Sequence, residues 1–211
     1  DGPGRFETIQ HEAGRLFNNI IQPNPNLPAE IGPRLFGGFA FDAGHRSEGF
    51  WSAFPAACFV LPHYQLTRLQ GRLWLTINHL LAPDEASHRI QSLLEDDIDE
   101  LRRILHTGSE TQADRPNPVT NIIELTKAER WRQLISDTTR RIRRGELEKV
   151  VLARARQMSL HRPVDPVQVL TRLQRNYPNC FRFLFEPIPG HAFFGATPEL
   201  LAQVNGSQLH T

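Results

Sequence analysis

Leu147-Glu148-Lys149-Val150-Val151-Leu152-Ala153-Arg154 is the most informative segment of this 211-residue chain, together with a second segment fifty residues later. Its centre is a short, nearly continuous apolar run with β-branched side chains, which predicts a buried strand. Such a strand would carry Lys149 into apolar surroundings, where burial disfavours the charged ammonium and leaves the amine available as a base. The pattern therefore predicts a catalytic base at Lys149. The alternative is that the lysine stem is buried at the start of the strand while its head stays in water.

A second segment, Gly195-Ala196-Thr197-Pro198-Glu199-Leu200-Leu201, places a carboxyl group beside an apolar run in a similar way. Glu199 follows a turn-like break and precedes two leucines, so its carboxyl is expected at the edge of an apolar region. Apolar surroundings favour the protonated carboxyl, which makes Glu199 the matching candidate for a general acid. A purely structural role, in which Glu199 caps or pairs locally, stays open.

These two segments resemble signature segments of the chorismate-utilising enzymes, specifically of their isochorismate synthase branch. The resemblance implies that Lys149 activates a water molecule for attack at C2 of chorismate and that Glu199 protonates the departing C4 hydroxyl. Weaker similarity to the amino-terminal half of isochorismate synthases is found at Phe36-Gly37-Gly38-Phe39-Ala40-Phe41-Asp42 and at Trp51-Ser52-Ala53-Phe54-Pro55. The resemblance covers most of the chain, and the two later segments are the specific ones.

Lys149 also favours one branch of the resembled family. Members that use ammonia, such as the anthranilate synthase large subunit, typically have glutamine at this place, so the lysine favours attack by water. Salicylate synthases share the lysine and stay open as an alternative, as do anthranilate and aminodeoxychorismate synthase component I. The pathway, menaquinone or siderophore biosynthesis, also stays open. An alternative from another class is a non-catalytic scaffold or interaction domain in which Lys149 and Glu199 are structural.

Members of the resembled family are much longer than this chain, which corresponds to their amino-terminal half to two-thirds. The resemblance implies a Mg²⁺ cofactor whose ligands follow Thr211, so no Mg²⁺ ligand is assigned here and this chain alone is expected to be inactive. The first residue is Asp1 rather than Met, which agrees with a trimmed or proteolytic piece. Because an incomplete sheet exposes strand edges and apolar surface, self-association of this piece is expected.

Composition argues against several other classes of function. A formal net charge of +1 with 22% charged residues is too weak a field to indicate nucleic acid or membrane as the main partner. No apolar stretch approaches the ~20 residues of a membrane span and no signal-peptide pattern opens the chain, so a cytoplasmic enzyme is expected. The nine histidines include no i, i+4 pair typical of a helical zinc site, so no metal ligand is predicted.

The expected fold class is α+β: antiparallel sheets with packed helices, in a partial chorismate-utilising-enzyme fold like that of anthranilate synthase component I. Helical spacing predicts helices over residues 6–21 and 84–106. The second helix has an acidic face formed by Glu95, Asp96, Asp97, Asp99 and Glu100. Between the helices, an antiparallel meander with a tight turn at Gly71 is predicted from the apolar runs 35–41, 57–61, 65–69 and 73–79.

A polar, proline-containing stretch over residues 107–121 is the predicted linker. It divides the chain into an amino-terminal region, 1–120, and the start of a chorismate-binding catalytic region, 121–211. The catalytic region is expected to contain, in order, a helix opened by the capping box Thr126-Lys127-Ala128-Glu129 and ending near Gly145, the Lys149 strand, a helix capped by Asp165-Pro166, a strand over 181–185 and a hairpin turning at Asn205-Gly206.

Overall fold

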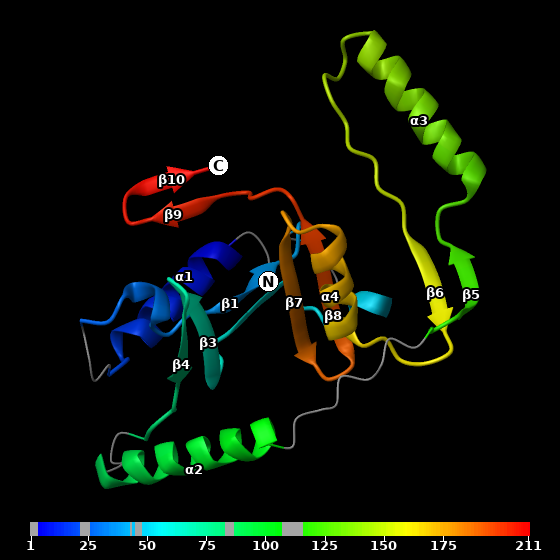
Figure 1. Cartoon of the computed structure of the whole chain (residues 1–211). Coiled ribbons are helices and arrows are strands. Elements are labelled where there is room, and N and C mark those ends of the chain that lie inside the picture. The colour runs from blue at the N-terminus through cyan, green and yellow to red at the C-terminus, as the bar shows by residue number, and fades with distance from the viewer. Residues whose placement is uncertain (1–3, 22–25, 43, 45–47, 83–86, 107–115) are drawn as a thin grey trace. The chain divides into compact units, whose positions relative to one another are not determined.

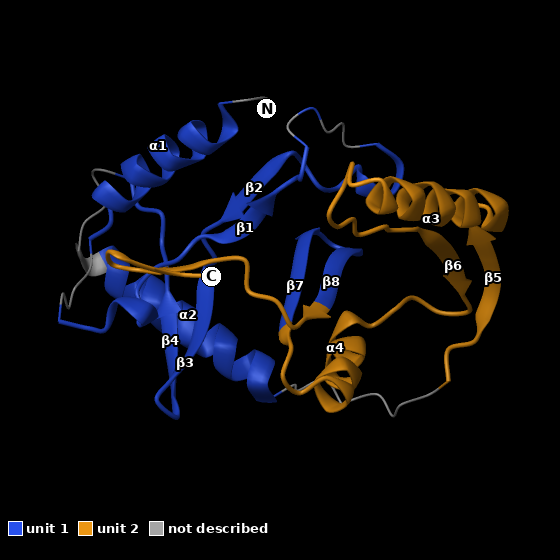
Figure 2. Ribbon diagram, turned by 90° about the horizontal axis from the view of Figure 1, so that it is seen from above, with its two compact units in different colours: residues 1–110, 182–195 blue, residues 111–181, 196–211 orange. Residues whose placement is uncertain are grey.

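A computed structural model describes the chain apart from residues 1–3, 22–25, 43, 45–47, 83–86 and 107–115. The described residues form helices and antiparallel strand pairs, so the predicted α+β class is confirmed (Figure 1). Within this part of the chain every sheet contains two strands, and no closed barrel is present. The chain divides into unit 1, residues 1–110 and 182–195, and unit 2, residues 111–181 and 196–211 (Figure 2). The expected boundary between residues 120 and 121 stays a prediction.

Unit 1 contains two long helices, two strand pairs and most of a third pair from later in the chain. Its elements are α1 (Arg5–Asn18), η1 (Ala29–Ile31), β1 (Phe36–Phe39), η2 (Gly49–Trp51), β2 (Ala57–Val60), β3 (Tyr64–Leu69), β4 (Arg72–Ile77) and α2 (Ser87–His106), together with β7 (Phe181–Ile188) and β8 (His191–Thr197). The predicted helices and strands of this region are therefore present, with shifted ends. Asp84, the predicted start of the second helix, lies outside the described residues.

Strand β1 pairs with β2, and the two backbones approach closely at Gly37. A Cβ atom at Gly37 would lie 1.9 Å from the carbonyl oxygen of Cys58, so only glycine fits there. Beside this pair, the ring of Phe39 packs on Phe6 of α1 and Phe59 of β2 at centroid distances of 4.4 and 5.0 Å. The aromatic rings attach α1 to the first strand pair, and the glycine allows the two strands of that pair to approach closely.

Strands β3 and β4 form a hairpin that turns where the sequence predicts. Gln70 and Gly71 have φ angles of 49° and 78°, as a two-residue turn with positive φ at both positions requires. The predicted continuous meander is wrong, because β2 pairs with β1 and β3 pairs with β4 in separate sheets. Only residues 61–63 join β2 to β3. This connection contains Pro62, which has no N–H to donate to a neighbouring strand, and it contains no glycine, asparagine or aspartate of the kind that forms a tight hairpin turn.

Unit 2 begins with β5 (Val119–Glu124), which starts inside the predicted linker and pairs with β6 (Arg156–Leu160). Helix α3 (Ala128–Arg143) lies between these strands in the sequence. Its N-cap is Lys127, without a side-chain capping bond, so the predicted capping box does not form. Its end at Gly145 is confirmed: Gly145 has φ 74° and donates its N–H to Ile142, while Glu146 donates to Arg141, as in a Schellman motif.

The remaining elements of unit 2 follow their local sequence signals closely. Helix α4 (Pro166–Asn176) begins as predicted, because Asp165 Oδ1 accepts hydrogen bonds from the N–H groups of Val167 and Gln168 at 2.9 and 3.3 Å. Strands β9 (Gln203–Asn205) and β10 (Gln208–His210) form the predicted last hairpin, with Gly206 at φ 58°.

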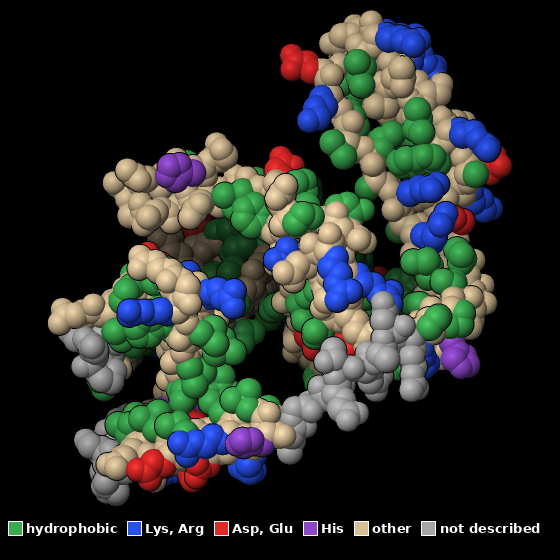
Figure 3. Space-filling view, in the orientation of Figure 1, with side chains coloured by type: hydrophobic (Ala, Val, Ile, Leu, Met, Phe, Trp, Pro, Cys, Tyr) green, Lys and Arg blue, Asp and Glu red, His purple; other side chains and the backbone are tan. Residues whose placement is uncertain are grey.

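Few apolar side chains are buried in the described residues. Ile31 and Ala56 are the buried hydrophobic residues, whereas large apolar side chains from most elements remain exposed (Figure 3). Among the described helices, none combines the length and apolar character that crossing a membrane requires.

Candidate functional site

Lys149 lies in an irregular, exposed segment between α3 and β6, so the predicted buried strand is wrong. Val151, the centre of the apolar run, is 83% exposed, and regular pairing begins only at Arg156. The reason is that a strand needs a partner. Arg156 pairs with Glu124, the last residue of β5, and one further bond joins Leu125 N–H to the carbonyl of Ala155. Residues 149–154 therefore lie beyond the end of β5, where this strand offers them no backbone partner.

Glu199 lies in the loop between β8 and β9, and its side chain is exposed. Its backbone N–H donates to the Thr197 hydroxyl oxygen at 3.2 Å, a local bond that shapes the Thr-Pro-Glu turn. The turn-like break before Glu199 is therefore present. The side chain is exposed, however, so burial of its carboxyl against an apolar region is not observed.

The two candidates both belong to unit 2. Within the described part of the chain, neither the Lys149 side chain nor the Glu199 carboxyl forms a hydrogen bond or an ion pair. Both side chains are exposed, so the apolar surroundings that the sequence predicts for them are not observed in the described residues. Their assignment as base and acid stays a prediction.

The chain leading to Glu199 is held by an aromatic cluster in unit 1. Phe193 of β8 lies 5.8 Å from Trp51, 6.3 Å from Phe54 and 5.2 Å from Phe183, measured between ring centroids. Trp51 and Phe54 belong to the upstream segment Trp51-Ser52-Ala53-Phe54-Pro55. Two segments that lie far apart in the sequence therefore pack together, and sequence reasoning did not identify this contact.

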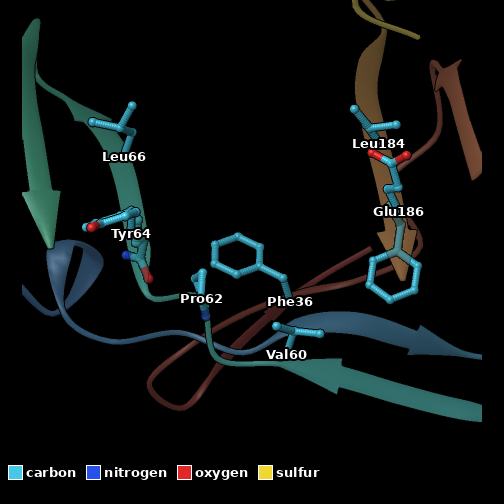
Figure 4. Close-up of a pocket in the computed structure, with 9 residues that line it drawn as sticks. Phe36, Val60, Pro62, Tyr64, Leu66, Leu184 and Glu186 are labelled. Atoms are coloured by element: carbon cyan, nitrogen blue, oxygen red, sulfur yellow. The ribbon is translucent and has the colours of Figure 1, made fainter. Parts of the chain in front are cut away.

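Unit 1 also contains an open pocket of about 340 Å³. Tyr64 and Leu66 of β3 line one side, Leu184 and Glu186 of β7 line the other, and Phe36 lies between them (Figure 4). The lining is mainly apolar. The Glu186 carboxylate accepts a hydrogen bond from the Gly190 N–H at 2.8 Å, within the β7–β8 turn. Neither Lys149 nor Glu199 lines this pocket.

A cluster of polar side chains joins the open end of the β3–β4 hairpin to α2. The buried Asp97 carboxylate receives hydrogen bonds from His63 Nε2 at 2.9 Å, the Tyr64 hydroxyl at 2.8 Å and His79 Nε2 at 2.5 Å. Asp97, one of the five residues of the predicted acidic face, is therefore buried where α2 meets the hairpin. His63 precedes β3 and His79 follows β4, so both flank the open end of the hairpin and contact α2 through Asp97.

The environment of this cluster sets its charges. Desolvation raises the pKa of Asp97, but the hydrogen bonds from His63, Tyr64 and His79 outweigh it and hold that pKa below its ordinary value. The hydrogen bond to Asp97 raises the pKa of His63, against the opposing effect of burial. Burial first, and Asp97 second, raise the pKa of Tyr64, so its hydroxyl stays a donor.

Three side chains of this cluster, those of His63, His79 and Asp97, lie close enough together to share a metal ion. They form the group of this kind found among the described residues. Its donors are two imidazoles and one carboxylate. Mg²⁺ prefers an octahedron of oxygen ligands, so this set does not suit the cofactor that the resemblance implies. No histidine pair at helical spacing marks these residues. The register of the predicted hairpin could have indicated the two histidines. A turn at Gly71 places His63 opposite Asn78, which precedes His79.

Comparisons with known proteins extend over the whole chain. The family model for chorismate binding enzymes matches residues 1–211. The chain is 28% identical to the salicylate biosynthesis isochorismate synthase of Pseudomonas aeruginosa, covering 100% of this chain and 42% of that protein. It is 29% identical to isochorismate synthase MenF of Bacillus subtilis, covering 83% of this chain and 36% of the relative. No solved structure matches the chain.

The chain thus spans less than half the length of these relatives. The family match nevertheless includes both the Lys149 and the Glu199 segments and the aromatic cluster. The chain therefore belongs to the chorismate binding enzyme family.

Proposed function

We propose that the whole protein to which this chain belongs is an isochorismate synthase that converts chorismate to isochorismate. The observation that carries the proposal is the family match over residues 1–211, supported by relatives that are named isochorismate synthases. Lys149 supports this branch further, because a lysine suits activation of water whereas ammonia-using members typically have glutamine there. The substrate proposed is therefore chorismate, with water as the nucleophile.

The proposed mechanism uses Lys149 as general base and Glu199 as general acid. The neutral amine of Lys149 takes a proton from water as its oxygen bonds to C2 of chorismate. The ring double bonds shift, the C4–O bond breaks, and Glu199 gives a proton to the departing hydroxyl, which leaves as water. One water molecule is consumed and one is released, so the overall change is an isomerisation.

Both groups need surroundings that the described residues of this chain do not provide. A lysine acts as a base near neutral pH when burial or neighbouring charge favours the neutral amine, and Lys149 is exposed. We therefore propose that the 211-residue chain alone is inactive and that further parts of the whole protein enclose Lys149 and Glu199. Mg²⁺ is proposed as the cofactor of the whole protein, and none of its ligands is assigned to this chain.

A non-catalytic scaffold, in which Lys149 and Glu199 contact other parts of the whole protein, is the second candidate, favoured by the exposure of both side chains. Stability distinguishes the two functions. A structural lysine lowers the melting temperature of the whole protein when it is changed to alanine, whereas a catalytic lysine leaves it unchanged or raises it.

The experiment that tests the proposal is chromatographic identification of the product that the whole protein forms from chorismate and Mg²⁺, with and without ammonia. Isochorismate formation that is independent of ammonia is expected. Salicylate would identify the alternative branch, and an amino product that requires ammonia would identify the anthranilate or aminodeoxychorismate branch. Absence of chorismate turnover would favour the scaffold.

Glu199→Gln in the same assay tests the acid. The variant is expected to lose about 10²–10⁴-fold in rate, the contribution typical of general acid catalysis. Glu129→Gln is the matched control, because Glu129 is an exposed glutamate of α3 whose ion pair among the described residues is with Arg132. Equal rates for the two variants would contradict the role of Glu199.

A further inference from the structure

We propose that His63, His79 and Asp97 form a binding site for a transition-metal ion of the Zn²⁺ type, which joins the open end of the β3–β4 hairpin to α2. The site is in unit 1, whereas Lys149 and Glu199 are in unit 2. Its three ligands are residues other than Lys149 and Glu199, so its occupancy can be measured without any assay of chorismate turnover.

The donor atoms and their spacing suit a zinc-type ion. Two imidazole nitrogens and a carboxylate oxygen all lie within 4.8 Å of one another. Zn²⁺ binds such atoms at about 2.0–2.2 Å, which places tetrahedral ligands about 3.3 Å apart. The Asp97 oxygens lie 2.9 Å from His63 Nε2 and 2.5 Å from His79 Nε2. Each of these two contacts needs to lengthen by less than about 1 Å to admit the ion.

The three side chains come from separate parts of unit 1 and converge on one point. His63 precedes β3, His79 follows β4, and the two imidazole rings have centroids 4.8 Å apart at an interplanar angle of 83°. Asp97 reaches them from the middle of α2. The backbone bond from Asn78 N–H to the His63 carbonyl, 2.8 Å long, holds the end of the hairpin together. The ligands are thus positioned by secondary structure rather than by mobile side chains alone.

Outer hydrogen bonds orient two of the three ligands. His63 donates its Nδ1–H to the carbonyl of Asn78 at 2.8 Å, which directs Nε2 toward Asp97. A backbone carbonyl on the second ring nitrogen is the usual partner of a metal-binding histidine. The Tyr64 hydroxyl donates to Asp97 Oδ1 and lies 3.2 Å from Glu100. Tyr64 is therefore a positioning residue for the carboxylate.

The site also satisfies a buried charge. Asp97 is 7% exposed, and a carboxylate removed from water needs strong partners. In the structure the two imidazole N–H groups supply them, and a divalent cation between the same atoms would supply them equally well. Three protein ligands leave a fourth tetrahedral position for water. The nitrogen-rich donor set selects Zn²⁺ over Mg²⁺.

Calorimetric titration of the chelator-treated, untagged 211-residue chain with Zn²⁺ tests this proposal. One ion per chain is expected, with no detectable binding of Mg²⁺ at the same concentration. His79→Ala and Asp97→Asn are expected to weaken binding by more than the 10–100-fold typical of losing an outer partner. Tyr64→Phe keeps all three ligands and is expected to weaken it by about 10-fold. Substitution of Co²⁺ should produce the intense visible bands of a tetrahedral site.

Matched controls separate this site from general surface binding. His191→Ala removes an exposed histidine of β8, and Asp96→Asn removes an exposed carboxylate beside Asp97 on α2. Both are expected to bind Zn²⁺ like the unsubstituted chain. Circular dichroism establishes that each variant is folded, and Tyr64→Phe provides the test should the ligand variants unfold. Absence of Zn²⁺ binding, or equal affinity in Asp97→Asn and Asp96→Asn, would overturn the proposal and leave a hydrogen-bond network.

Discussion

The ring of Phe183 on β7 covers the backbone of Gly195 on β8, and this packing explains why a glycine opens the segment that carries Glu199. A Cβ atom at position 195 would lie 3.0 Å from Cζ and 3.2 Å from Cε1 of Phe183. The same ring packs on Phe193 at a centroid distance of 5.2 Å. Glycine therefore allows the aromatic cluster to close over β8 just before the chain reaches Glu199.

Gly195→Ala is expected to destabilise the protein by about 1–3 kcal/mol, because the added methyl displaces a packed ring. Urea denaturation followed by circular dichroism measures the change. In a double-mutant cycle, Phe183→Leu should remove most of this cost, since the shorter side chain leaves room for the methyl. An alanine variant as stable as the unsubstituted chain would show that the ring does not constrain position 195.

Gly37 and Gly38 are neighbours in β1 with opposite surroundings. Gly37→Ala is expected to cost about 3 kcal/mol or more, because its Cβ would lie 1.9 Å from the Cys58 carbonyl oxygen. Gly38→Ala meets no atom within 4 Å and is expected to leave stability unchanged or raise it by less than about 1 kcal/mol. Melting temperatures of the two variants provide the comparison, and similar values would contradict the close approach of β1 and β2.

Features set by short-range chemistry were predicted well from the sequence. Asp165 and Pro166 open α4 because a carboxylate accepts the free N–H groups and proline lacks one. Gly145 ends α3 because its positive φ is accessible to glycine at little cost. The turn at Gly71 is explained in the same way. Each of these signals needs only residues that are neighbours in the sequence.

Features that depend on distant partners were predicted poorly. Val150, Val151 and Leu152 have the composition of a strand, but no described strand pairs with them, since β5 ends at Glu124. Asp97 has the spacing of an exposed acidic face, but two histidines from the hairpin make its burial favourable. Hydrophobic periodicity contains no information about which strand or side chain will lie opposite, so these errors share one cause.

Self-association of this 211-residue chain is expected because large apolar side chains are exposed on both units. Val151 and Leu201 lie in the two motif segments and are 83% and 91% exposed. Sedimentation velocity over a range of concentrations should show species that grow with concentration. The double change Val151→Ser and Leu201→Ser should reduce this growth, with Thr67→Ser as a control that removes no large apolar group. A single monomer at every concentration would contradict the expectation.

Turnover of chorismate by the whole protein carrying Lys149→Ala, compared with Lys127→Ala, tests the central claim most directly. Lys127 and Lys149 are the two lysines of this chain, and both are exposed in the structure. Lys127→Ala is therefore a matched control for Lys149→Ala. Loss of a general base is expected to reduce the rate by about 10²–10⁴-fold in Lys149→Ala, with the melting temperature maintained and Lys127→Ala close to the unsubstituted protein. Isochorismate formation at comparable rates in both variants would contradict the assignment of Lys149 as the base.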